Sequence, residues 1–164
     1  MSKSYQIDVI KAKKAKKRYD FFVDDQVIAS VDYPKRYEKK AVLGTPDRQW
    51  EIHRKGWWKP SIEIVSAQSP YTKWSLPQSW RHTVSLRADD NRAFVMKQRS
   101  FWSGSLIWVN DKDETVIEIK PYRWSYSNRG TITITDKNDT NLIFLALIGW
   151  FLFQTAREDA AAAI

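Results

Sequence analysis

The residue types that most often carry catalysis are sparse in this chain. Its two histidines, His53 and His82, lie 29 residues apart and match no spacing typical of a metal site. The chain has no cysteine and no Gly-x-Ser-x-Gly sequence, and its five glycines form no phosphate-binding loop. The carboxylate pairs Asp89-Asp90 and Asp111 with Asp113 fall in turn-like segments, where aspartate stabilises the turn itself. We therefore expect no catalytic residue, no metal site and no cofactor, and we predict that the protein is not an enzyme.

Positive charge is the second chemical feature of the sequence. The formal net charge is +8, and one short segment concentrates it. Six of the eight residues from 11 to 18 are basic: Lys11, Lys13, Lys14, Lys16, Lys17 and Arg18. Such a run favours contact with phospholipid head groups or nucleic acid, although a solvated strand or loop that only keeps a protein soluble has the same composition.

Basic and aromatic residues also alternate in two segments that resemble each other. Residues 50–65 align without gaps with residues 94–109, so that Trp58, Ser61 and Val65 recur as Trp102, Ser105 and Val109. Each copy reads as a strand, a basic and aromatic turn, and a strand. We interpret the copies as two equivalent hairpins of one curved sheet or barrel. The turns add four basic candidates and two interfacial aromatic ones: Arg54, Lys55, Lys59, Arg99, Trp57 and Trp58. The alternative for the aromatic pair is that one tryptophan folds back onto the end of the barrel.

Short strands must position these residues. Residues 21–23 and 27–31 flank an Asp-Asp-Gln turn, and residues 105–109 and 115–119 flank Asn-Asp-Lys-Asp, so each pair predicts a hairpin. Residues 131–135 read Thr-Ile-Thr-Ile-Thr, the alternation of a strand with one buried face. No amphipathic helical pattern interrupts the chain between about residues 19 and 135. This region therefore predicts an all-β structure.

One uninterrupted apolar run, residues 142–153, follows the strands. Its 12 residues are fewer than the roughly 20 that cross a bilayer, so a buried helix is favoured over a membrane span. Asp139 or Thr140 can cap its start, and we expect a helix at about residues 140–158. A helix that is apolar on all faces in a soluble protein has to be surrounded by protein. The preceding strands would have to wrap it, with many of the 23 aromatic side chains filling the space between.

A long series of strands followed by one wholly apolar helix, here Asp-Thr-Asn-Leu-Ile-Phe-Leu-Ala-Leu-Ile-Gly-Trp-Phe-Leu-Phe at residues 139–153, resembles the tubby C-terminal, LURP-one-related and phospholipid scramblase group. The resemblance implies a mainly β fold, a closed antiparallel β-barrel wrapped round one hydrophobic C-terminal α-helix, in a single domain over residues 1–164. Within this group, tubby domains resemble phosphoinositide-binding modules and the scramblases are membrane-associated, whereas many short bacterial relatives have no assigned role. The chain lacks the cysteine-rich segment of scramblases, so scrambling is not expected.

These observations lead to a non-enzymatic domain that binds anionic phospholipid head groups or a similar anionic surface through its basic residues. A nucleic-acid-binding β-module and a barrel that holds a small apolar ligand are the alternatives. The absence of cysteine, and of a signal peptide in residues 1–20, favours a cytoplasmic location, peripheral to the membrane if the lipid interpretation is right. The sequence indicates no oligomeric state.

Overall fold

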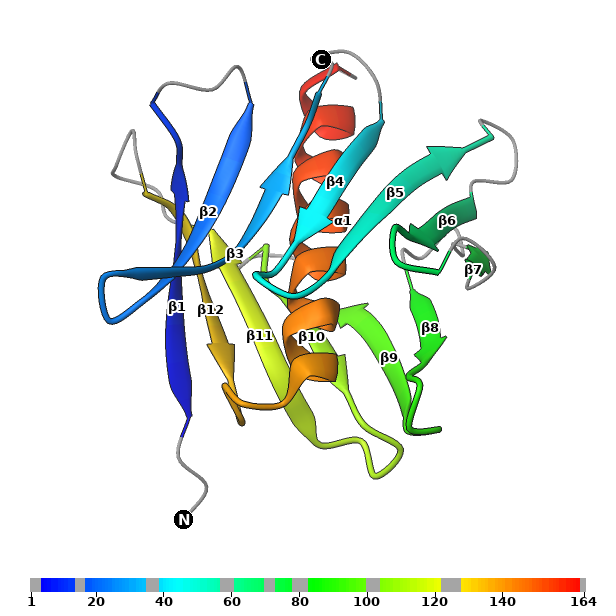
Figure 1. The fold of residues 1–164 in the computed structure, drawn as a ribbon. Helices are drawn as coiled ribbons and strands as arrows, with labels where there is room; N and C mark the ends of the chain where they lie inside the picture. Colours follow the sequence, from blue (N-terminus) through cyan, green and yellow to red (C-terminus); the bar gives the residue numbers. More distant parts are fainter. Residues whose placement is uncertain are drawn as a thin grey trace.

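The computed structural model describes residues 4–13, 17–34, 39–56, 61–69, 73–77, 83–99, 104–121 and 128–162. Within them the chain forms twelve strands followed by one helix (Figure 1). In chain order these are β1 (Tyr5–Lys11), β2 (Arg18–Val23), β3 (Gln26–Asp32), β4 (Lys40–Gly44), β5 (Gln49–Lys55), β6 (Ser61–Ser66), β7 (Lys73–Pro77), β8 (Val84–Arg87), β9 (Ala93–Gln98), β10 (Leu106–Val109), β11 (Thr115–Pro121), β12 (Asn128–Ile134) and α1 (Thr140–Ala162).

All twelve strands belong to one antiparallel sheet. Its order is β7-β6-β5-β4-β3-β2-β1-β12-β11-β10-β9-β8, so most strands pair with their neighbours in sequence. The exception is the pairing of the first strand with the last, in which Tyr5 lies opposite Ile134. The edge strands are therefore β7 and β8, and no backbone ladder joins them within the described residues. The mainly β fold with one apolar C-terminal helix is confirmed, whereas closure of the sheet into a complete barrel is not.

Each hairpin that the sequence predicts is present. In the β2–β3 hairpin, Val23 pairs with Gln26 across Asp24 and Asp25, whose φ angles are 50° and 63°. Two consecutive positive φ values are typical of the tight turn whose twist matches that of the flanking strands, and aspartate tolerates them better than most residues. Strands β10 and β11 also pair, and β12 buries Ile132 and Ile134.

The two similar segments form hairpins with the same register. Ile52 lies opposite Ile64 in the β5–β6 hairpin, and the residues 44 positions later, Met96 and Trp108, lie opposite each other in the β9–β10 hairpin. All four side chains are buried. The prediction of two equivalent hairpins is therefore confirmed.

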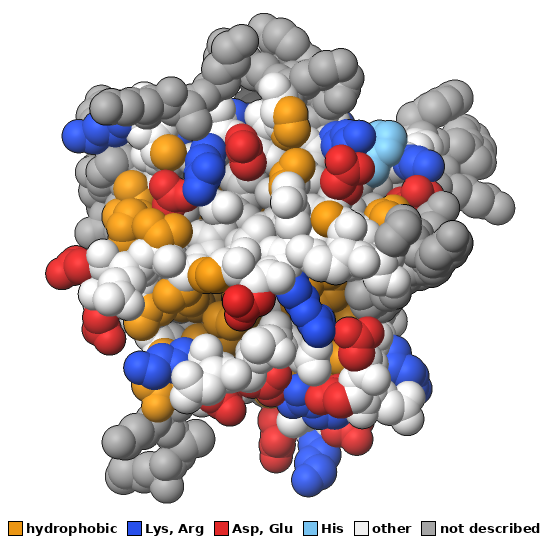
Figure 2. Space-filling model, in the orientation of Figure 1, with side chains coloured by type: hydrophobic (Ala, Val, Ile, Leu, Met, Phe, Trp, Pro, Cys, Tyr) orange, Lys and Arg blue, Asp and Glu red, His pale blue; other side chains and the backbone are white. Residues whose placement is uncertain are grey.

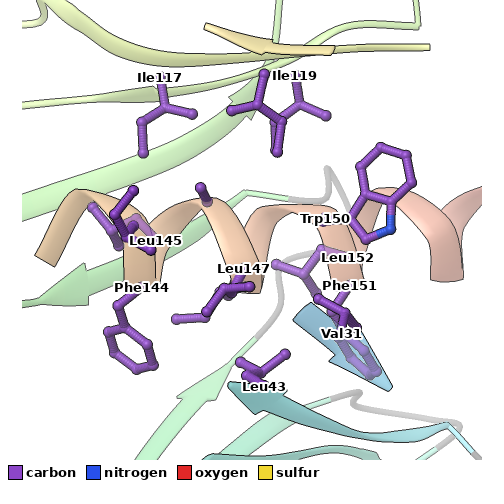
Figure 3. Packing of buried hydrophobic residues seen from close by; sticks show 14 of the residues in the cluster. Val31, Leu43, Ile117, Ile119, Phe144, Leu145, Leu147, Trp150, Phe151 and Leu152 are labelled. Carbon is purple, nitrogen blue, oxygen red and sulfur yellow. The ribbon is translucent and has the colours of Figure 1, made fainter. Parts of the chain in front are cut away.

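Helix α1 lies inside the curved sheet. Every residue from Leu142 to Phe153 is buried, and the helix contacts β3 and β4 as well as β10 and β11. Figure 3 shows Val31 and Leu43 on one side of the helix and Ile117 and Ile119 on the other. The strands therefore enclose the helix, which explains why it is apolar on all faces.

The helix is longer than its apolar core. It has 23 residues, about 35 Å at 1.5 Å per residue. Residues Thr140–Glu158 are long and apolar enough to cross a membrane by length and composition, although 72% of the most apolar window is buried inside the protein. Length therefore does not decide between a core helix and a span, contrary to what the 12-residue run indicates. The burial of α1 by strands on both sides is the more informative observation.

Candidate functional site

The predicted basic residues of three hairpins, where the structure describes them, lie at one end of the sheet. Strands β1, β5 and β9 run toward this end, and their antiparallel partners β2, β6 and β10 begin there. The hairpin β1–β2 and the last turns of α1 both lie at the top in Figure 1. We call this the basic end, marked by Lys11, Lys17, Arg18, Arg54, Lys55 and Arg99. Residues more than 80 positions apart in sequence are thus brought to one end of the fold.

Four of these residues form ion pairs. Lys17 pairs with Glu158 of α1 and lies 4.2 Å from the ring centre of Tyr33, and only 11% of its side chain is exposed. Further pairs join Arg18 to Asp20 at 2.9 Å, Lys55 to Glu63 at 3.0 Å, and Arg99 to Glu118. Lys17 therefore lies at the edge of the core, although its place in a basic run predicts an exposed side chain.

Of the remaining predicted residues, the structure describes three, and five lie outside the described residues. Lys11 and Lys13 form no ion pair with the part of the chain that the structure describes, and Lys13 is exposed. Arg54 lies at the end of β5 and is half-buried. The other candidates lie outside the described residues: Lys14, Lys16, Lys59, Trp57 and Trp58. Lys11 and Lys13 are consequently the most available to a partner among the predicted basic residues that the structure describes.

Glu118 is held as a carboxylate near the basic end. Its burial opposes ionisation, but side-chain hydrogen bonds from Arg99 and Lys120, together with their charges, outweigh this effect and lower the pKa of Glu118. The Lys120 Nζ lies 3.2 Å from the second carboxylate oxygen. The two cations therefore keep Glu118 ionised, and Glu118 in turn neutralises part of their charge.

The two ends of the sheet differ in charge. The described residues of the connections at the basic end, 12–13, 17, 33–34, 39, 56, 83, 99 and 104–105, include four basic residues and no acidic residue. The described residues of the connections at the opposite end, 24–25, 45–48, 67–69, 88–92, 110–114 and 135–139, include ten acidic and four basic residues. We call this opposite end the acidic end. Sequence reasoning missed the separation because it assigned the basic excess mainly to one short segment, residues 11–18.

The acidic end contains an open cavity of about 690 Å³. It lies between the β2–β3 turn, the β4–β5 turn and the start of α1. Trp50 and Phe144 line it and stack on each other with ring centroids 4.5 Å apart. Ile143 extends this apolar surface, and Asp24 and Asp47 also line the cavity. The sequence shows no signal for this site because its parts come from distant turns.

The start of α1 beside the cavity is capped. Asp139 accepts a hydrogen bond from the backbone N–H of Asn141 at 3.1 Å, as an N-cap residue does. Arg92 donates two hydrogen bonds to the Asp139 carboxylate, at 2.8 and 3.1 Å, and one to Asp90 at 2.6 Å. These contacts fix the helix start to the β8–β9 turn.

Among the described residues, His53 and the two carboxylate pairs do not meet in a metal site. His53 lies in β5, and His82 lies outside the described residues. Asp89, Asp90, Asp111 and Asp113 lie in the turns before β9 and β11. Within the described residues, no group of three or more acidic or histidine side chains is placed to hold a metal ion.

Comparison with known proteins identifies no family. No family model matches the chain, and no curated protein matches it. Among solved structures, the chain is similar to an X-ray structure of a protein from Arabidopsis thaliana, with 13% sequence identity and a TM-score of 0.48. The match covers 88% of this chain and 89% of the plant protein. At this identity and score, the similarity supports no inference about function.

Proposed function

We propose that the protein is a non-enzymatic, tubby- and LURP-one-like domain that binds anionic phospholipid head groups through its basic end. The observation that carries the proposal is the convergence of basic residues from the β1–β2, β5–β6 and β9–β10 hairpins at one end of the sheet. The excess of acidic residues in the opposite turns supports it further. A protein with this distribution of charge is drawn to an anionic surface with one end foremost.

The expected contacts are those of lysine and arginine with phosphate. Lysine acts as a point charge, whereas the planar guanidinium of arginine can donate two parallel hydrogen bonds. Each basic residue near an anionic surface contributes roughly 1 kcal/mol, and salt screens the attraction. Lys11 and Lys13 should contribute most among the described residues, because Lys17, Arg18, Lys55 and Arg99 are already paired with carboxylates.

The aromatic residues predicted between the basic ones would add to this contact. Tryptophan has an apolar body and a polar N–H group, and it favours the interface between head groups and acyl chains. Trp57 and Trp58 lie in the connection between β5 and β6, next to Lys59 in the sequence. We therefore include them in the proposed contact.

Co-sedimentation with liposomes tests the proposal. The full chain is mixed with neutral phosphatidylcholine vesicles or with vesicles containing phosphatidylserine, at low and physiological salt, with single-stranded DNA as competitor. We expect pelleting only with the anionic vesicles, weakened by salt and unaffected by DNA. No pelleting under any condition would contradict lipid binding. Release by DNA would favour the nucleic-acid alternative.

A matched pair of variants separates a site from net charge. Lys11→Gln/Lys13→Gln removes two charges at the basic end, and Lys112→Gln/Lys137→Gln removes two at the acidic end. We expect the first variant to bind anionic vesicles at least about tenfold more weakly, and the second to bind like the wild type, because about 2 kcal/mol is lost only at the basic end. Equal weakening by both variants would mean that net charge, and not the basic end, determines binding.

The alternative of a barrel with an apolar ligand in its interior is not proposed. Helix α1 fills the space enclosed by the strands, and its side chains from Leu142 to Phe153 are buried there. No described feature favours nucleic acid over phospholipid, so nucleic acid enters only as an outcome of the competition experiment.

A further inference from the structure

The cavity at the acidic end is not used by the proposed lipid contact, which involves the opposite end of the sheet. Figure 2 shows hydrophobic side chains within a hollow at the lower left of the face in view. The cavity volume, about 690 Å³, falls within the range of small-molecule sites in proteins. Its parts, two hairpin turns and the first turns of a capped helix, are held by the sheet and by the core. The site is therefore formed before any ligand binds.

The interior of the cavity is apolar and aromatic. Trp50 and Phe144 are 4% and 5% exposed, and Ile143 lies beside Phe144. Val23 and Ile28 of the β2–β3 hairpin line the cavity and are half-buried. Val27 at the same hairpin is 46% exposed, and it is the one large aliphatic or aromatic residue among those described that is exposed. An apolar group placed here would cover surface that the fold leaves open to water.

The rim of the cavity carries more negative than positive charge. Asp24, Asp47 and Asp89 line it together with Arg48 and Lys137. The Nη1 atom of Arg48 lies 3.8 Å from the Oδ2 atom of Asp89, so Arg48 compensates the negative charge of that carboxylate. Asp24 and Asp47 form no ion pair with other described residues, whereas Lys137 lies 4.9 Å from the ring centre of Tyr5. The carboxylates of Asp24 and Asp47 are therefore available to pair with a cationic group in the cavity.

The start of α1 does not make the rim attractive to anions. An uncapped helix N-terminus attracts anions, because its N–H groups carry partial positive charge. Here the carboxylate of Asp139 already accepts the hydrogen bond of the Asn141 N–H group. A cationic group therefore suits the rim better than an anionic one.

We propose that this cavity binds a small molecule with an aromatic or branched apolar body and a protonated amine. The body would lie on Trp50, Phe144 and Val27, and the amine would face the carboxylates of Asp24 and Asp47. A binding site with an apolar interior and a few charged groups at its rim typically obtains affinity from the body and specificity from the rim. The proposal does not depend on lipid binding, since the two sites lie at opposite ends of the sheet.

The test uses three probes with one body and different heads: 4-phenylbutylamine, 4-phenylbutanol and 4-phenylbutyrate. Binding to the full chain is followed by two-dimensional ¹H–¹⁵N NMR, which reports both affinity and the residues that respond. We expect the amine to bind more tightly than the alcohol, and the alcohol more tightly than the carboxylate. The shifts should be concentrated at residues 23–28, 45–50 and 137–144.

Variants at the rim and in the interior separate the two parts of the site. Asp24→Asn and Asp47→Asn should each weaken binding of the amine by roughly two- to fivefold, the range for exposed charge pairs, and should leave the alcohol unaffected. Asp25→Asn is the matched control, because Asp25 occupies the same turn with a positive φ but does not line the cavity. Val27→Asn should weaken all three probes alike, because it removes apolar contact.

Three results would overturn the proposal. Tightest binding of the carboxylate probe would show that the rim selects anions. Shifts dispersed over the surface, or no saturable binding of any probe up to its solubility limit, would show that the cavity is not a ligand site. Equal losses of amine binding in Asp25→Asn and in the two rim variants would show that only the general charge of the acidic end matters. None of these results would affect the liposome experiment.

Discussion

Gly149 offers the sharpest test of how α1 is packed. It is the only glycine in α1, and it is buried between Trp108 and Ile119. A Cβ atom at this position would lie 2.5 Å from the Cδ1 atom of Ile119 and 2.8 Å from the Nε1 atom of Trp108. Both neighbours are 0% exposed, so neither can move into solvent. The substitution Gly149→Ala therefore requires the core to shift.

Two effects of Gly149→Ala oppose each other. Alanine is favoured over glycine in a helix interior by about 1 kcal/mol. Forcing one additional carbon into a filled core costs about 1–3 kcal/mol. The free energy of unfolding should therefore fall, by up to about 2 kcal/mol, whereas in a helix without close neighbours it would rise. For a domain of this size, 1 kcal/mol corresponds to about 2–4 °C in Tm.

A double-mutant cycle with Ile119→Val isolates the contact. Ile119→Val removes the Cδ1 atom that the new Cβ would meet, and alone it should cost about 0.5–1.5 kcal/mol. In the double variant the two losses should not add, and the free energy of unfolding should exceed the additive value by at least about 0.5 kcal/mol. Relief should be incomplete because Trp108 remains in place.

Urea unfolding followed by circular dichroism measures all four proteins of the cycle. Ala156→Gly, an exposed position in the same helix, calibrates the helix-propensity effect alone. Stabilisation by Gly149→Ala, together with additive effects of the two substitutions in the double variant, would refute the packing of α1 against β10 and β11.

Three further predictions concern groups that the fold buries or pairs. The Tyr33 hydroxyl is buried without a hydrogen-bond partner among the described residues, so Tyr33→Phe should raise the free energy of unfolding by about 1 kcal/mol in urea titrations. Burial, with smaller contributions from Tyr19 and Glu158, raises the pKa of Tyr33. The contribution of Tyr33 to stability is therefore complete below about pH 10 and is lost as pH rises further. Tyr33→Phe should reduce the resulting fall of Tm at alkaline pH. The pKa of Glu118 is instead lowered, since Arg99 and Lys120 outweigh burial, so its contribution is complete above about pH 4.5 and is lost as pH falls through the lowered pKa. Glu118→Gln should flatten the decline of Tm below that pH, and an unchanged decline would contradict the pairing. Asp139→Ala should cost about 1–2 kcal/mol by removing the helix cap, and Asp139→Asn, which keeps a capping oxygen, should cost less when both are measured by urea unfolding.

The sequence predicted those elements that depend on local patterns. Residues 131–135 alternate and all but the last lie in strand β12, and residues 142–153 are wholly apolar and lie in the buried part of α1. The two similar segments form hairpins in the same register, because a turn between two short strands sets their pairing locally. By contrast, the pairing of β1 with β12 joins residues more than 100 positions apart, and no local signal specifies it.

The candidate sites depend on this long-range arrangement. In an up-and-down sheet, alternate connections share an end, so the charges of the connections separate into two groups only once the strand order is known. The same order brings Trp50 of β5 against Phe144 of α1 and thereby forms the cavity. Lys17 shows that sequence alone does not predict the burial of a single side chain. Its neighbours in sequence indicate a solvated charge, whereas its contacts with Glu158 and Tyr33 bury it.

The core and the basic end are physically linked through α1. The inner faces of the strands carry side chains such as Ile7, Phe21 and Leu43 that are 0% exposed, and removal of α1 would expose them to water. Burial of the helix therefore stabilises both the helix and the sheet, and this explains why a helix apolar enough for a membrane remains inside the sheet. Near its C-terminal end the same helix carries Glu158, which pairs with Lys17 directly before strand β2 at the basic end. The packing that buries α1 thus also holds one of the hairpins that present positive charge, so core variants that loosen the helix should weaken the lipid binding proposed above even when every lysine and arginine is retained.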